Sequence, residues 1–391
     1  MSLIRLGFWA ASGAGAGVSY WLATLGGSGS DEGYSVALDS SGNSYAFGFT
    51  DSTGAGDRDF LLAKHDSAGT IQWQRILGGA ARDWGRSVAI DSSDNIYVFG
   101  YTSSAGAGSS DFLLAKYNSS GTIQWQRILG GGSAETGYAV AIDSSDNIYV
   151  VGETGSAGAG DDDFLIAKYN SSGTIQWQRV LGGSGNDKCF SAAIDSSDNL
   201  YVFGYTASTG AGSNDFLLAK YNSSGTIQWQ RVLGGSSNEN ANSITIDSSG
   251  NIYVCGFTLS AGEGSLDFLI AKYNSSGTIQ WQRVLGGTGD DRGNSIGIDS
   301  SDNIYVLGQT ASTGSGSDDF LIAKLPNDGS LTGTYVLDGV DIVYSASTLT
   351  GATSTLTAAT SSLTAAASSL TGATSTLTAA DVTLTSYLVE L

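Results

Sequence analysis

Short runs of β-branched and aromatic residues alternate with polar segments along most of the chain. One period holds four such runs, at residues 86–91, 95–102, 111–118 and 122–129. The segments DSSDN and NSSG separate the first run from the second and the third from the fourth. Such residues favour tight turns, because their side chains bond the nearby backbone or they tolerate positive φ. Each period therefore predicts a four-stranded antiparallel meander.

The meander repeats with a constant step of 52 residues. The tryptophan of the fourth run recurs at Trp21, Trp73, Trp125, Trp177, Trp229 and Trp281. In the second run, IYVFGY, apolar residues occupy both odd and even positions. Both faces of that strand must therefore be covered by other parts of the protein. Six copies of one such unit predict an all-β, six-bladed β-propeller of four-stranded blades. The tryptophans are expected to be structural, packed between neighbouring blades.

The two ends of the repeat region raise the question of how the ring is completed. The segment SYWLATLGG at 19–27 precedes any complete unit, and we expect it to supply the fourth strand of blade six and close the ring. The run at 330–337 is an alternative, although Gly333 stands where the other copies have tryptophan. The expected domains are a peptide and Gly/Ala linker at 1–18, the propeller at 19–339 and a stalk at 340–391. The opening residues would make a poor secretory signal because their apolar run is short.

Leucines recur every seven residues in the C-terminal segment. They stand at Leu349, Leu356, Leu363, Leu370, Leu377 and Leu384. An odd period would alternate between the faces of a strand but suits a helix, and an alanine follows most of these leucines by three residues. The spacing predicts a coiled-coil stalk that joins copies of this chain, with a trimer as the first expectation. A disordered linker and a membrane-inserted segment are the alternatives; the many Ser and Thr residues argue against membrane insertion.

Charge and single residues exclude several classes of function. The 391 residues carry a formal net charge of −20, which argues against binding to nucleic acid or to an anionic membrane. The only histidine, His65, stands alone at a predicted strand end, so no catalytic group and no cofactor are predicted. Cys189 and Cys255 are expected to be small buried residues rather than a disulfide.

One acidic position recurs in every copy. It is occupied by Asp31, Asp83, Glu135, Asp187, Glu239 and Asp291. A ring of carboxylates could hold Ca²⁺. Because the acid is present in all six units, hydrogen bonding within turns or between blades is the preferred interpretation, and no metal site is predicted.

The motifs DSSDNIYVFGYT and AKYNSSGTIQWQRILGG resemble those of the bacterial β-propeller repeat family, typified by GNIYVTGYT, DFFVAKYDSSGNLLW and LGG. The resemblance covers about residues 19–339. It implies a propeller and transfers no catalytic residue, because the family is functionally broad.

Differences between the copies concentrate in the connections of one predicted edge. Off-pattern aromatic and cationic residues gather there, and we predict that they bind a ligand. The candidates are Tyr34, Arg82, Trp84, Arg86, Tyr138, Lys188, Phe190 and Arg292. Such side chains could stack on, and hydrogen-bond to, a host-surface glycan or protein. Drift of exposed loops is the alternative explanation.

The combination of head, stalk and N-terminal peptide resembles bacteriophage appendage proteins. The sequence thus favours a non-enzymatic virion protein, such as a tail fibre, tail-associated or capsid-decorating protein, located on the virion surface and anchored by another virion or surface protein. A bacterial cell-surface or secreted adhesion propeller is the alternative. A polysaccharide-degrading propeller enzyme is a more distant one.

Overall fold

The computed structural model describes residues 21–314, 316–337, 340–347, 349–353, 357–360, 364–367 and 385–390, and only the backbone beyond Leu349. Its repeat region is built from six antiparallel blades. Blade 1 contains β2 (Asp31–Leu38), β3 (Ser44–Thr50), β4 (Asp59–His65) and β5 (Ile71–Leu77). Blade 2 contains β6 (Asp83–Ile90), β7 (Ile96–Thr102), β8 (Asp111–Tyr117) and β9 (Ile123–Gly130). Blade 3 contains β10 (Glu135–Ile142), β11 (Ile148–Thr154), β12 (Asp163–Tyr169) and β13 (Ile175–Gly182).

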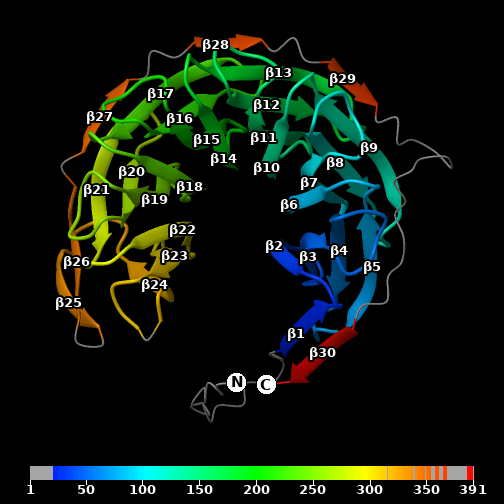
Figure 1. Cartoon of the computed structure of the whole chain (residues 1–391), viewed down its shortest axis with the longest axis horizontal. Helices are drawn as coiled ribbons and strands as arrows, with labels where there is room; N and C mark the ends of the chain where they lie inside the picture. Colours follow the sequence, from blue (N-terminus) through cyan, green and yellow to red (C-terminus); the bar gives the residue numbers. More distant parts are fainter. Residues whose placement is uncertain are drawn as a thin grey trace.

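The remaining blades follow the same order. Blade 4 contains β14 (Asp187–Ile194), β15 (Leu200–Thr206), β16 (Asp215–Tyr221) and β17 (Ile227–Gly234). Blade 5 contains β18 (Glu239–Ile246), β19 (Ile252–Thr258), β20 (Asp267–Tyr273) and β21 (Ile279–Gly286). Blade 6 has three strands, β22 (Asp291–Ile298), β23 (Ile304–Thr310) and β24 (Asp319–Leu325). The first strand of each blade faces the middle of a propeller-like arc and the last strand lies outside (Figure 1).

The blades have two chemically different edges. The turn edge holds the connections at 39–43 and 66–70 in blade 1 and their equivalents, whereas the loop edge holds those at 51–58 and 78–82 and their equivalents. At the turn edge the Asp91 carboxylate accepts the backbone N–H of Ser93 at 3.0 Å and of Asn95 at 2.9 Å. Asp94 takes the left-handed backbone conformation, at φ 59°, that such a turn requires. The same turn also joins blades, because Asp94 accepts from the Ser40 hydroxyl of blade 1 at 2.7 Å.

A tryptophan and an arginine of each fourth strand hold the turn of the following blade. Trp73 Nε1 donates to the carbonyl of Ser119 at 3.4 Å, and Arg75 Nε donates to the carbonyl of Gly121 at 2.7 Å. Gly121 has φ of 75°, and an added Cβ there would lie 2.9 Å from the Trp73 ring. The contact recurs with each of the five tryptophans from Trp73 to Trp281.

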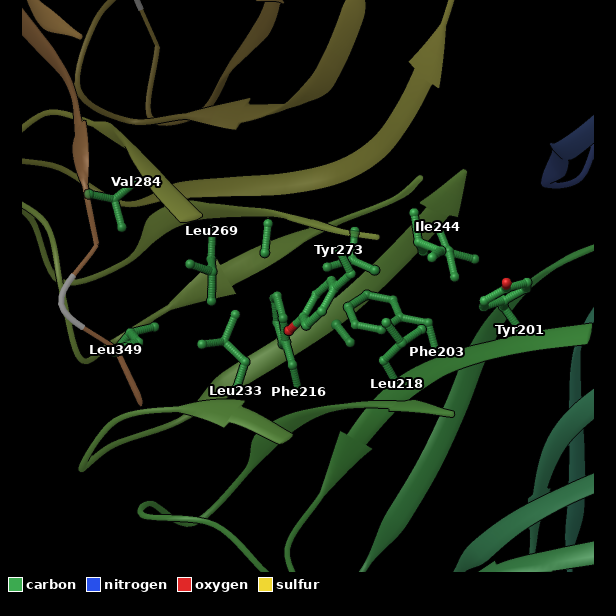
Figure 2. Packing of buried hydrophobic residues seen from close by; sticks show 14 residues of the cluster. Tyr201, Phe203, Phe216, Leu218, Leu233, Ile244, Leu269, Tyr273, Val284 and Leu349 are labelled. Carbon is green, nitrogen blue, oxygen red and sulfur yellow. The ribbon is translucent and has the colours of Figure 1, made fainter. Parts of the chain in front are cut away.

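The hydrophobic core lies between blades rather than inside them. Each of the five large buried clusters combines residues of two neighbouring blades, and Figure 2 shows the one between blades 4 and 5. Phe216 of blade 4 and Leu269 of blade 5 are both at most 1% exposed in it. Full burial of such a side chain contributes about 1.5–3 kcal/mol. Both cysteines are free and buried, as expected.

The arc does not close through β1 (Trp21–Gly26), so the prediction of a ring closed by the N-terminal strand is wrong. Among the described strands β1 pairs only with β30 (Thr385–Glu390), and β24 pairs only with β23 (Figure 1). Phe320 is 75% exposed on β24, whereas its five counterparts in blades 1–5 are at most 1% exposed. The alternative fourth strand, β25 (Gly333–Leu337), leaves blade 6 because it forms a hairpin with β26 (Val340–Ala346) on the outer edge of blade 5.

The predicted helical stalk is also wrong, because the C-terminal segment forms strands. The described residues contain no helix, and thus none that could cross a membrane. After β26, the strands β27 (Thr350–Thr353), β28 (Thr357–Thr360) and β29 (Thr364–Ala367) add to blades 4, 3 and 2. In Figure 1 these strands run around the outside of the arc. We call β26–β29 the belt.

The seven-residue period matches the step from one blade to the next. The equivalent arginines of successive fourth strands, Arg283, Arg231, Arg179 and Arg127, pair with Ala346, Thr353, Thr360 and Ala367. Each step moves seven residues along the belt and one blade along the arc. Seven extended residues span about 23 Å. Each belt strand pairs with one blade, and a three-residue link separates it from the next belt strand. The seven-residue period therefore does not place successive leucines on opposite faces of one continuous strand, because no strand continues from one leucine to the next.

One heptad leucine shows what this position does. Leu349 is 7% exposed and packs in the cluster between blades 4 and 5, close to Leu233 and Leu269 (Figure 2). Ile342, seven residues earlier, is buried in the cluster between blades 5 and 6. Leu349 thus packs within its own chain rather than along a coiled coil. The other five predicted oligomerisation leucines, Leu356, Leu363, Leu370, Leu377 and Leu384, lie outside the described residues.

Leu349→Ala should lower the free energy of unfolding by about 2–4 kcal/mol, because it leaves a cavity between two blades. The control Leu331→Ala removes a 46% exposed leucine and should cost less than about 0.5 kcal/mol. Chemical denaturation measures both variants. Equal stability of the two would show that Leu349 does not pack in this cluster.

Candidate functional site

A β-bulge lies in every inner strand close to the loop edge. The pairing register shifts between Gly33 and Ser35 in blade 1, which leaves Tyr34 without a partner, and the same shift recurs in the other five blades. A bulge re-aims the side chain of its extra residue. The bulge residues are Tyr34, Arg86, Tyr138, Phe190, Asn242 and Asn294.

The fold requires a small residue immediately before the bulge but leaves the bulge residue itself free to vary. An added Cβ at Gly85 would lie 2.3 Å from the Gly48 carbonyl oxygen and 2.6 Å from the Phe47 ring of the preceding blade. The two blades whose position is not glycine carry Cys189 and Ala241. The sequence can therefore change at the bulge without changing the packing between blades.

The bulge residues of blades 1–4 join neighbouring side chains in a continuous cluster that we call the aromatic array, in which most rings are half-buried and Phe49 is fully buried. Trp84 lies with its ring centroid 4.9 Å from that of Phe49 and 6.2 Å from that of Tyr34. Farther along the arc, the Tyr138 and Phe190 rings are 4.9 Å apart. The array consists of Tyr34, Phe49, Trp84, Tyr101, Tyr138, Phe190 and Tyr205.

Two guanidinium groups lie within the array. Arg58 Cζ is 4.3 Å from the centroid of the Phe49 ring and 4.2 Å from that of Trp84. Arg86 Cζ is 4.9 Å from the Tyr34 centroid, 4.7 Å from the Trp84 centroid and 5.6 Å from the Tyr138 centroid. Arg86 therefore connects the aromatic rings of blades 1, 2 and 3, and such cation–π contacts are each worth about 0.5–2 kcal/mol.

The polar groups of the array are desolvated but incompletely bonded. Trp84 Nε1 and Arg86 Nε are buried and have no hydrogen-bond partner among the described residues. Burial raises the pKa of the Tyr138 hydroxyl, and the nearby Glu153 carboxylate adds to this. Burial also raises the pKa of Tyr34, whose hydroxyl donates to Glu32 at 2.6 Å. Both phenols are therefore neutral hydrogen-bonding groups at neutral pH.

The other predicted cations are neutralised by acids of the same surface. Arg82 pairs with Asp57 at 3.0 Å, at the margin of the array. Lys188 is held by Glu153 and Asp162, both at 3.0 Å. Burial opposes its charge, but the attraction of Glu153 and Asp162 outweighs burial and raises the pKa of the ammonium. On blade 6, Arg292 pairs with Asp290 at 2.9 Å and Asp318 at 3.9 Å.

The structure thus brings together five of the eight predicted ligand-binding residues, Tyr34, Trp84, Arg86, Tyr138 and Phe190. Sequence reasoning placed Arg58 at the same edge without selecting it as a ligand-binding residue, and it did not identify Phe49, Tyr101 or Tyr205. The last three are cross-strand partners of variable inner-strand residues: Phe49 pairs with Glu32, Tyr101 with Trp84 and Tyr205 with Lys188. Pairing the strands of the predicted meander would have identified these three.

The recurring acid of the inner strand serves the connection that precedes it. Asp83 accepts the backbone N–H of Gly79 at 2.7 Å, and the equivalent bond is present in all six copies. The third-strand acid lies close by, since an added Cβ on Gly130 would touch both Asp111 and Glu135. No group of three or more metal-ligating side chains occurs in the described part of the chain.

His65 stands in a comparable structural setting. Its ring stacks on Trp21 with centroids 5.6 Å apart, and burial lowers its pKa. It is therefore a neutral packing residue.

Comparison with protein families supports the repeat architecture. Residues 72–106, 124–158, 228–262 and 280–314 match the family described as a beta-propeller repeat. Residues 92–123 match a beta-propeller domain of unknown function.

Curated relatives share only part of their length with this chain. An uncharacterized WD repeat-containing protein of Acanthamoeba polyphaga mimivirus is 24% identical over 172 residues, which are 34% of this chain and 12% of that protein. Regulatory protein FlaEY of Caulobacter vibrioides is 26% identical over 184 residues, 42% of this chain and 19% of that protein.

Solved structures are similar at the level of repeat architecture. Virginiamycin B lyase from Staphylococcus aureus is 13% identical, with a TM-score of 0.48, over 78% of this chain and 89% of that one. A gluconolactonase from Xanthomonas campestris is 12% identical, with a TM-score of 0.39 and the same coverage of both chains.

The acidic pairs predict how stability depends on pH. Burial, together with a neighbouring acid, raises the pKa of Asp59, Asp163, Asp215 and Asp267 to about 6. Their contribution to stability is complete below the unfolded pKa of about 3.9 and is lost as the pH rises through 6. Asp39 acts oppositely: burial is outweighed by hydrogen bonds from Asn43, which lower its pKa to about 2, so its contribution is lost as the pH falls below about 4.

We therefore expect the thermal midpoint to be higher near pH 4.5 than at pH 8. Asp215→Asn should raise the midpoint at pH 8 and reduce this difference, because the amide cannot ionise. The exposed Asp161→Asn is the control and should leave the difference unchanged. A midpoint that rises steadily from pH 4.5 to pH 8 would contradict the assignment.

Proposed function

Because this chain belongs to the bacterial β-propeller repeat family, we propose that it is a non-enzymatic binding protein whose aromatic array holds a host-surface glycan or protein. The observation that carries this proposal is the gathering of copy-specific side chains on one surface of blades 1–4. The array joins rings of blades 1 and 2, and rings of blades 3 and 4, at centroid distances of 4.9–6.2 Å, and Arg86 links the two groups. The turn edge, in contrast, repeats nearly the same residues in each copy.

The contrast between the edges supports different roles for them, namely blade packing at the turn edge and binding at the loop edge. At the turn edge the repeated side chains are occupied in holding neighbouring blades together, for example Trp125 on the turn that contains Gly173. At the loop edge the bulge residue is not required for that packing. Aromatic residues and arginine dominate the residues that carry most of the energy in protein interfaces. Their concentration at this free position favours a binding role over drift.

The proposed setting is the surface of a virion, with the protein as a bacteriophage appendage attached by another virion protein. A bacterial cell-surface or secreted adhesion protein is the alternative. Both settings use the same array against an external partner. Mass spectrometry of purified virions separates them, because the chain should be present at stoichiometric abundance in the first setting and absent in the second.

The binding proposal predicts that Trp84→Ala and Tyr138→Ala each weaken binding about 10-fold or more, which corresponds to a loss of about 1.4 kcal/mol. A glycan array and a panel of host-surface proteins, probed with the purified full chain, measure this effect. Circular dichroism spectra and thermal midpoints would verify that the variants are folded.

Gln124→Ala provides the matched control, because this glutamine is exposed on β9 near the turn edge. It should bind as the unchanged protein does. The proposal fails if no glycan or host protein binds, or if the control weakens binding as much as the two array variants.

A further inference from the structure

We infer that the array recognises an acidic glycan, whose carboxylate or sulfate binds to the guanidinium groups of Arg58 and Arg86; this inference rests on the function proposed above. The cations at the loop edge differ in whether an acid neutralises them. Arg82, Lys188 and Arg292 each pair with an acid within 3.0 Å. Arg58 and Arg86 form no such pair with any carboxylate in the described residues. Residues 1–20 contain no acidic side chain that could supply one.

Arg58 and Arg86 differ from the other cations in the described residues, each of which bonds an acid or a backbone carbonyl. The formal net charge of the chain is −20, with 37 acidic residues against 17 Lys and Arg. Acids are abundant at the same edge, since Asp57 directly precedes Arg58 in sequence yet pairs with Arg82 instead. A pair of guanidinium groups without acid partners, held within one surface, is therefore a local positive site in an otherwise acidic protein.

The contacts that hold the two arginines are made with aromatic rings. The Arg58 guanidinium lies 4.2–4.3 Å from two ring centroids, and Arg86 contacts three. A guanidinium stacked on aromatic rings keeps its N–H donors around its own rim, where they match the two oxygens of a carboxylate. Nearby aromatic surface lowers the local dielectric and strengthens such a bond.

Two donors of this region already lack partners. Arg86 Nε and Trp84 Nε1 are buried without a hydrogen-bond partner in the described part of the chain. A buried donor left unpaired is costly, so native structures normally satisfy such groups with protein, water or ligand. The two nitrogens are covered by protein, so an anion would reach the half-buried Arg86 through the terminal nitrogens of its guanidinium group.

The rest of the array favours a sugar over an acidic peptide as the carrier of the anion. Aromatic faces carry partial negative charge and attract the weakly positive C–H groups of a sugar face. The rings continue from Trp84 through Tyr138 to Phe190, so a chain of several sugars could extend from the anionic end. Beyond Arg58 and Arg86 the cations of the surface are paired, which leaves no second unpaired cation cluster for a run of acidic residues.

The experiment compares acidic glycans with their neutral parents on the full chain. The probes are sialyllactose against lactose, a sulfated lactose, oligogalacturonate against a neutral galactan fragment, and a poly-glutamate peptide. We expect at least one acidic glycan to bind 10-fold or more tightly than its parent. Arg58→Gln and Arg86→Gln should each remove this preference.

Arg82→Gln is the matched control, because Arg82 lies 5.7 Å from the Trp84 ring centroid but is already paired with Asp57. It should change the preference less than twofold. Equal binding of acidic and neutral glycans, or a preference that survives both Gln variants, would overturn the inference while the proposed function stands. Binding of poly-glutamate without any acidic glycan would overturn the assignment to sugars. Absence of binding to every glycan and host protein would overturn both proposals.

Discussion

The contact between each fourth strand and the turn of the next blade is the constraint on which the rest of the structure depends. A tryptophan ring lies against a glycine at positive φ, and the arginine two residues later bonds the carbonyl of that glycine, as with Arg127 Nε and Gly173 at 2.6 Å. Any Cβ at the glycine would enter the ring. The contact is short-ranged and directional, so it fixes both the turn and the angle between blades, and sequence change at the turn edge is tolerated poorly.

The belt solves a second problem, which is the free edge of the fourth strands. Exposed edges of sheets are templates for pairing with other chains. Strands β27–β29 cover three such edges, and β26 covers a fourth. Because β27, β28 and β29 have only four residues each, their pairing is weak alone, and Leu349 adds burial between two blades. The absence of charged residues from 342 to 367 suits strands that lie against the outer edges of the blades.

The sequence predicted the repeated meander well, because its period and its turn residues report local chemistry that each blade satisfies alone. It failed where one pattern fits two structures. A leucine every seven residues fits a helical seam, but it also fits a strand that restarts on each blade, and only the spacing between β17, β13 and β9 distinguishes them. Ring closure failed similarly, because the N-terminal strand could complete blade 6 or pair with another strand, and it pairs with β30. For the array, sequence located the variable positions but not Phe49, which contributes through strand pairing.

The array also shows why six equal positions need not have equal roles. The repeated cations are used by the scaffold itself: Lys116 pairs with Asp91 at 3.5 Å, and the equivalent pair recurs in four other blades. Only copy-specific residues are available for another role. Some of these also bond within the scaffold, since the bulge residue Asn242 donates to the Gly293 carbonyl of the next blade at 2.6 Å. Three aromatic rings and the guanidinium group of Arg86 occupy the bulges of blades 1–4, and Arg86 forms no bond of this kind to the next blade. The packing between blades is therefore nearly the same in each copy, while the side chains at the loop edge differ from blade to blade. This is possible because the bulge residue can change without changing the contacts that hold the blades together.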